Sequence, residues 1–103
     1  MLNEFKKDRF VIHCKTADEW RLLIDYTYDN IEDMRDISRE KWYSYYFGYD
    51  NGVCLRCADS GVCYSNYDHY VYHDLKIITY HEFQRGISKM LMPSKCDLMD
   101  FLI

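Results

Sequence analysis

The sequence has little proline and glycine, no excess of basic charge and no long apolar run. With 1 proline and 4 glycines in 103 residues, it contains no internal repeat, low-complexity tract or linker. The formal net charge of -4 argues against nonspecific nucleic-acid binding, because affinity for phosphates comes mainly from Lys and Arg. No apolar run approaches the roughly 20 residues that span a bilayer, and residues 1–8 lack the apolar stretch of a secretion signal. We therefore expect a cytoplasmic protein with no membrane partner.

The remaining composition is that of a folded protein. Hydrophobic residues make up 49% of the chain and charged residues 29%, so enough apolar surface is available to offset the entropy of ordering. A chain of 103 residues is long enough for one hydrophobic core and too short for two independent domains. We expect a single domain, 1–103.

Tyrosine is the most unusual component, with 11 copies, of which 8 lie between Tyr43 and Tyr72. Its flat ring and polar hydroxyl suit half-buried sheets and also binding surfaces. Aromatic ladders on a small sheet are the simpler explanation, and a tyrosine-rich contact surface is the alternative.

The first half of the chain predicts a strand followed by a helix. Residues 9–14 have the β-branched and aromatic content of a strand, and Thr16 and Glu19 form a capping box that predicts a helix from residue 17. Apolar residues recur at helical spacing through Ile31, so one side of this helix should pack. The rest of the helix and the segment after it are acidic: Asp18, Glu19, Asp25, Asp29, Glu32, Asp33 and Asp36.

From residue 42 the pattern predicts strands. The turn signal at 50–52 and a second at 59–61 divide residues 42–65 into a β-meander. A three-residue loop at 59–61 would place Cys57 directly across from Cys63. Residues 66–75 predict a short helix and residues 76–81 a last strand. We therefore expect an α+β fold, in which a small antiparallel sheet packs on one main helix.

The C-terminal segment, 94–103, follows the only proline and ends in an apolar run. Such a run either docks on the core or meets a partner.

Two cysteines and two histidines carry the strongest local signal for chemistry. Cys54 and Cys57 are followed, after 11 residues, by His69 and His73, and this pattern resembles the two-cysteine, two-histidine zinc finger. The resemblance implies a structural zinc ion held by a hairpin and a helix. It does not extend to DNA reading, because the predicted helix carries Asp68 and Asp74 where that family is basic.

Other interpretations of these cysteines stay open. Cys63 could replace Cys54, whose side chain in a regular strand points away from that of Cys57. Alternatively, the thiols are small buried hydrophobes and the histidines lie on an exposed helix. Cys14 next to His13 does not predict a catalytic pair, since neighbours on a strand face opposite sides. We predict no catalytic residues and no enzymatic activity.

The order of elements and the placement of aromatic residues over residues 9–83 resemble small accessory proteins of phages and prophages. The resemblance rests on a strand that ends with residues 10–16, a capped helix, a Trp- and Tyr-rich hairpin, and the stretch 72–78 before a final strand. It implies an anti-CRISPR protein that acts in the bacterial cytosol by stoichiometric binding. The implied target is a type II CRISPR effector nuclease or another basic host defence protein. The candidate contact residues are the acidic Asp25, Asp29, Glu32 and Asp33 or the aromatic Tyr46 and Tyr49.

Two other functions remain as alternatives. A zinc-bearing regulatory or adaptor module would bind nucleic acid or a host regulator, although direct nucleic-acid binding is not expected of so acidic a chain. A small zinc hydrolase ranks last, because a zinc ion with four protein ligands has no position for water.

Overall fold

The computed structural model describes residues 1–46 and 51–91, with side chains described as far as residue 87. Tyr49 and the apolar segment 94–103 lie outside these ranges. In the described ranges no helix is both long and apolar enough to cross a membrane. The elements, in chain order, are α1 (Leu2–Lys6), β1 (Val11–Cys14), α2 (Ala17–Asn30), the 3-10 helix η1 (Glu32–Asp36), α3 (Arg39–Ser44), β2 (Val53–Ala58), β3 (Gly61–Asn66), α4 (Tyr67–Tyr72), β4 (Ile77–Thr79) and α5 (Tyr80–Leu91).

The sheet has four strands in the order β3-β2-β1-β4. β1 pairs with β2, and β2 with β3, in antiparallel fashion, whereas β1 and β4 are parallel. The α+β class predicted from the sequence is confirmed, but a wholly antiparallel sheet is wrong. After β3 the chain passes through α4 and then enters β4. Strand β4 therefore runs in the same direction as β1.

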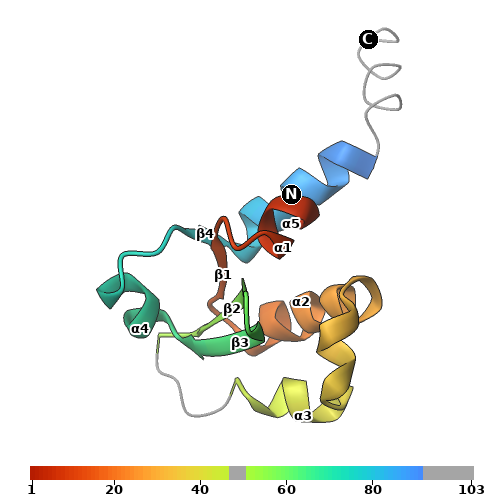
Figure 1. Cartoon of the computed structure of the whole chain (residues 1–103), viewed down its shortest axis with the longest axis horizontal. Coiled ribbons are helices and arrows are strands. Elements are labelled where there is room, and N and C mark those ends of the chain that lie inside the picture. The colour runs from red at the N-terminus through yellow and green to blue at the C-terminus, as the bar shows by residue number, and fades with distance from the viewer. Residues whose placement is uncertain (47–50, 92–103) are drawn as a thin grey trace, which may run out of the picture.

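Helices lie on both faces of this sheet (Figure 1). We call the face packed against α1, α2 and α5 the main face, where Ile12, Leu55 and Cys57 are buried. We call the opposite face the α4 face, where Val11 and Cys54 are buried with Tyr70 of α4. Successive strand residues alternate between the two faces, as expected for pleated strands.

The core on the main face is built from large side chains of every helical segment except α4 and includes two tryptophans. The indole N–H of Trp20 donates to the Trp42 carbonyl, and that of Trp42 donates to the Met34 carbonyl, each at 2.8 Å. A buried indole N–H needs such a partner. The first bond joins α2 to α3, and the second joins α3 to η1.

The stretch from residue 42 to 46 is not a strand, contrary to the sequence prediction. Ser38 caps α3 by accepting a hydrogen bond from the Lys41 backbone N–H at 3.3 Å, and the helix then carries Trp42 into the core. The aromatic content alone predicted a strand, but the Ser38 cap and the burial of the Trp42 indole favour a helix. The predicted meander is therefore reduced to the β2–β3 hairpin.

The hairpin has a different register from the predicted one. Ala58 pairs with Gly61 across a two-residue loop, which places Cys57 opposite Val62 and Arg56 opposite Cys63. Gly61 adopts a φ of +127°, which only glycine tolerates well. A three-residue loop, and with it the direct pairing of Cys57 and Cys63, is wrong.

The last predicted helix and strand are both present but shorter. Asn66 caps α4 by accepting from the His69 N–H at 2.8 Å. Thr79 and Glu82 form a reciprocal capping box at 3.1 Å, so the chain turns into α5 at Tyr80 instead of continuing as a strand to residue 81.

Candidate functional site

The predicted zinc ligands are spread over both faces of the sheet. Cys54 is buried on the α4 face beside Val11 and Tyr70, whereas Cys57 is buried in the core of the main face. Two strand residues three apart point to opposite faces, so these thiols cannot converge on one ion in this conformation.

The two histidines do lie together, on the exposed side of α4. The ring centroids of His69 and His73 are 4.5 Å apart. Cys63 shares the α4 face with Cys54, and its sulfur lies 3.9 Å from the Tyr70 hydroxyl. Across residues 1–46 and 51–91, no three His, Cys, Asp or Glu side chains are grouped to hold a metal ion. The described arrangement does not fit the four-ligand site, and zinc binding stays a prediction that a metal analysis of the purified protein would test.

The buried thiols behave as hydrophobic groups. Burial raises the pKa of Cys54 and that of Cys57 to about 12, and it raises the pKa of Cys14 well above its ordinary value. Burial, followed by the neighbouring Cys63, also raises the pKa of Tyr70. A thiol that keeps its proton is a poor metal ligand and a poor nucleophile.

Two of the predicted acidic contact residues are already engaged within the fold. Arg39 forms ion pairs with Asp25 at 3.2 Å and with Asp29 at 3.1 Å. The Tyr43 hydroxyl also donates to Asp25. These carboxylates hold α3 against α2, so they are less available to a partner than the sequence suggests.

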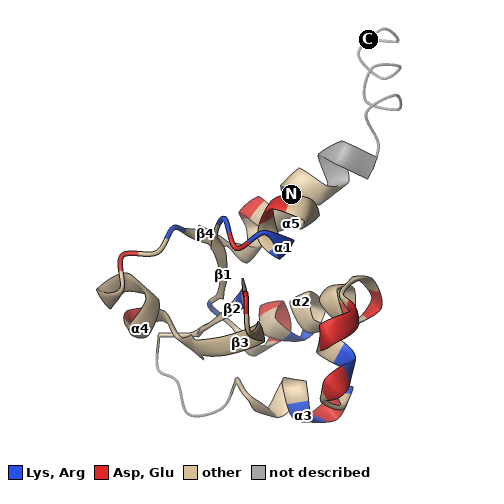
Figure 2. Cartoon of the chain, viewed as in Figure 1, with Lys and Arg blue, Asp and Glu red and all other residues tan. Residues whose placement is uncertain are grey.

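The other two predicted acidic contacts, Glu32 and Asp33, are exposed, as are the nearby Asp36 and Glu40. We call these four residues the acidic corner. Figure 2 shows the acidic residues along the chain from the end of α2 to the start of α3, with Lys and Arg between them. None of these four carboxylates forms an ion pair with any residue the structure describes. The nearby Arg35 is turned toward the end of α2, where it donates to the carbonyls of Tyr28 at 3.1 Å and Asp29 at 3.2 Å.

Of the two candidate aromatic contacts, only Tyr46 is described. Its ring is half-buried and its hydroxyl donates to the Lys15 carbonyl at 2.7 Å. This hydrogen bond joins the end of α3 to the segment between β1 and α2. Tyr46 therefore has a structural role, and the part in partner binding predicted for Tyr46 and Tyr49 stays a prediction.

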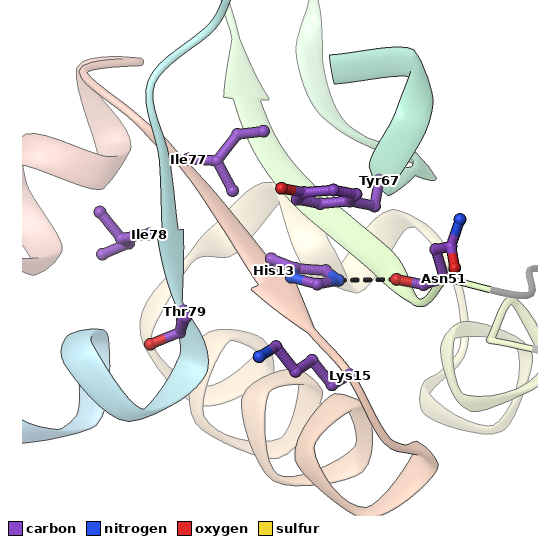
Figure 3. Close-up of a pocket in the computed structure, with 7 residues that line it drawn as sticks. All are labelled: His13, Lys15, Asn51, Tyr67, Ile77, Ile78 and Thr79. Atoms are coloured by element: carbon purple, nitrogen blue, oxygen red, sulfur yellow. Dashed lines mark hydrogen bonds between the residues drawn. The ribbon is translucent and has the colours of Figure 1, made fainter. Parts of the chain in front are cut away.

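A cleft on the α4 face brings together residues that the sequence did not single out. It has a volume of about 650 Å³ and is lined by His13, Lys15, Asn51, Tyr67, Ile77, Ile78 and Thr79 (Figure 3). Parallel pairing of β1 with β4 creates this site, and no local pattern indicated that pairing.

His13 is fixed at the centre of the cleft. Its Nε2–H donates to the Asn51 carbonyl at 2.8 Å, and its ring stacks on Tyr67 with centroids 4.3 Å apart. A Cβ on Gly52 would lie 2.8 Å from Nε2 and 2.3 Å from the Cys14 carbonyl oxygen, so only glycine fits there. As expected, His13 and Cys14 lie on opposite faces, and they do not form a thiol–imidazole pair.

Comparison with known proteins adds no assignment to this geometry. No family model, curated protein or solved structure matches the chain. The resemblance to phage accessory proteins therefore stays a prediction from sequence.

Proposed function

We propose that this protein binds a basic surface of another protein and inhibits it stoichiometrically, the target being the effector nuclease of a type II CRISPR system. The target class comes from the sequence resemblance over residues 9–83. The mode of action comes from the acidic corner, which is the observation that supports the proposal most directly.

The acidic corner has the properties of an electrostatic contact surface. Its four carboxylates are exposed and carry no internal counterion among the described residues. Arg39 is paired with the α2 carboxylates Asp25 and Asp29, whereas Arg35 binds α2 carbonyls and keeps its positive charge. With four carboxylates against the two exposed cations Arg35 and Lys41, the corner carries net negative charge on a braced backbone, and such charge speeds encounter with a basic partner.

Inhibition of this kind needs no active site. A nuclease that holds a nucleic-acid duplex has a positively charged channel. An acidic protein that covers part of this channel competes with the duplex for the same lysine and arginine side chains. The expected stoichiometry is one inhibitor for each effector, without turnover.

The direct test is cleavage of a DNA target by type II effectors at increasing amounts of this protein. We expect cleavage to stop near equimolar inhibitor for at least one effector. Full cleavage at a large molar excess, across a panel of type II effectors, would contradict the proposed target.

Charge-reversal variants test the mode of binding separately from the target. Glu32→Lys with Asp36→Lys should slow association about tenfold at low salt, because steering depends on local charge. Asp18→Lys with Asp68→Lys is the matched control, since it changes the net charge by the same amount at two exposed positions, one in the first turn of α2 and one on α4. Equal slowing by both pairs would show that total charge, and not the acidic corner, governs the encounter.

A further inference from the structure

The cleft exists because α4 covers only part of its face. β1 and β4 are parallel neighbours with His13 opposite Thr79, so both strands end at the same edge of the sheet. Two residues earlier on each strand, Val11 is buried under α4, and Ile77 packs beside it but stays partly exposed at the cleft. Beyond them, His13 and Thr79 line an open depression instead of a core. Ligands in sheets with parallel strands commonly bind at the carboxyl ends of those strands.

One wall of the cleft is a preformed aromatic surface. The rings of His13 and Tyr67 are tilted by 31° at a centroid distance of 4.3 Å, and His13 is only 6% exposed. The hydrogen bond to the Asn51 carbonyl and the close approach of Gly52 hold the imidazole in place. Ile77 lies beside the Tyr67 ring (Figure 3). Flat, rigid walls of this kind suit a planar ring.

The opposite side of the imidazole carries a free cation. Lys15 is the charged residue among those that line the cleft, and its ammonium makes no ion pair within the described part of the chain. Glu19 accepts from the Lys15 backbone N–H at 2.8 Å and contacts His81 at 3.1 Å. Asp68, near the other rim, accepts from the Asn51 amide at 3.1 Å. Lys15 is exposed at the rim of the cleft, and a lysine ammonium without a carboxylate partner there favours an anion.

We propose that this cleft binds a small molecule in which an anionic group is joined to a planar ring. The ring would lie against Tyr67 and Ile77, and the anion would reach Lys15 across His13, as the arrangement in Figure 3 allows. A volume of about 650 Å³ is within the range of small-ligand sites. A nucleoside monophosphate and an aromatic carboxylate both have this chemistry. The site is separate from the acidic corner and does not depend on the proposed inhibition.

The test is an NMR titration of the full chain with four types of probe. AMP and UMP represent the nucleotide, 1-naphthoate represents the aromatic carboxylate, adenosine supplies a ring without charge, and inorganic phosphate supplies charge without a ring. We expect at least one of the two types of planar anion, the nucleotide or the aromatic carboxylate, to shift the His13 and Thr79 signals saturably. It should bind at least tenfold more tightly than adenosine or phosphate. Whichever arm binds identifies the source of the anion.

Variants at two lysines test the assignment to this cleft. Lys15→Met should weaken binding at least tenfold, and it leaves the backbone hydrogen bond to Glu19 in place. Lys41→Met, at an exposed position on α3, is the matched control and should leave the affinity unchanged. Three results would overturn the proposal: no saturable shift with AMP, UMP or 1-naphthoate at millimolar concentration, equal weakening by both lysine variants, or binding of adenosine or phosphate as tight as that of the tightest planar anion.

Discussion

The two faces of the sheet differ in how they are covered. On the main face, α1, α2, α3 and α5 bury side chains completely, among them Phe5, Leu23 and Trp42. On the α4 face, one six-residue helix covers a small cluster around Val11, Cys54 and Tyr70. The rest of that face is the cleft around His13.

This difference separates stability from recognition within one small sheet. Burial of apolar area is the main stabilising term, and most of it lies on the main face. A face covered by one short helix has fewer apolar contacts and opens more readily in local fluctuations. Polar groups such as Lys15 and Thr79 can then be kept near solvent without weakening the main core. The predictions below compare a change on one face with a change on the other, or one end of the sheet with the other end.

Neighbouring residues on β2 give the largest expected contrast. Leu55→Ala on the main face should lower the free energy of unfolding by about 3 kcal/mol, because it leaves a cavity in a closed core. Cys54→Ala on the α4 face removes one sulfur and should lower it by about 1 kcal/mol. Urea unfolding of both variants measures this difference. Equal losses would show that the two faces contribute alike.

Two glycines of positive φ give the next contrast. Gly52 has a φ of +90°, and a Cβ added there would clash with His13 and the Cys14 carbonyl, whereas Gly61 has a φ of +127° and open space where a Cβ would lie. Gly52→Ala should lower the free energy of unfolding by about 3 kcal/mol through strain and a steric clash, and Gly61→Ala by about 1 kcal/mol through strain alone. Thermal unfolding compares the two. A Gly52→Ala variant as stable as Gly61→Ala would mean that the contact between β1 and the turn at the cleft is loose.

The elements best predicted from sequence are those with a local cap. Thr16 accepts from the Glu19 N–H at 3.1 Å, and Asn66 caps α4, so both helix starts were predicted correctly. Strand β1 was also found, since Phe10, Val11 and Ile12 are aromatic or β-branched. Caps and turns depend on neighbours in sequence, and their signal is therefore visible without the fold.

The errors occurred where tertiary contacts decide the structure. Trp42 and its neighbours have strand-like composition, but the indole bond to Met34 and the Ser38 cap hold them in a helix. The cleft could not be predicted either, because its residues meet only through the parallel pairing of β1 with β4. His13 and Thr79 lie more than 50 residues apart in the sequence, so no local pattern links them.

The pH dependence of stability at high pH compares the two faces through two buried thiols, one on each face. Cys54 and Cys57 have a folded-state pKa of about 12, against an ordinary thiol pKa of 9.0. Below pH 9 both states keep the proton, and between pH 9 and 12 only the unfolded chain loses it, so the free energy of unfolding falls as pH rises. At pH 10 each thiol should account for about 1.4 kcal/mol of that loss.

Alanine variants isolate each thiol in this pH dependence. Cys54→Ala and Cys57→Ala should each reduce the fall between pH 8 and 10 by the same amount, measured by urea unfolding at both pH values. The tyrosines and remaining cysteines are common to all variants and cancel in the difference. A smaller effect at Cys54 would indicate that the α4 face already admits water before global unfolding.

The smallest expected effect concerns an ion pair at the end of the sheet remote from the cleft. Arg56 of β2 binds Asp8 through Nε at 3.0 Å and through one terminal nitrogen at 2.9 Å. This bidentate pair, which raises the pKa of Arg56 chiefly through its hydrogen bond to Asp8, joins the segment before β1 to β2. Lysine cannot reproduce both bonds. Arg56→Lys should lower the free energy of unfolding by about 0.5–1 kcal/mol, since the pair is partly exposed.

A double-mutant cycle with Asp8→Asn measures the pair itself. Asn tolerates the φ of +61° at this position, so the change removes charge without adding backbone strain. The coupling between the two positions should be about 0.5 kcal/mol and should shrink in 1 M salt, because exposed charges are screened. A coupling that is zero at low salt would mean that apolar packing alone closes this end of the sheet. Both faces would then be held by the same force, and the contrast between them would be confined to the cleft.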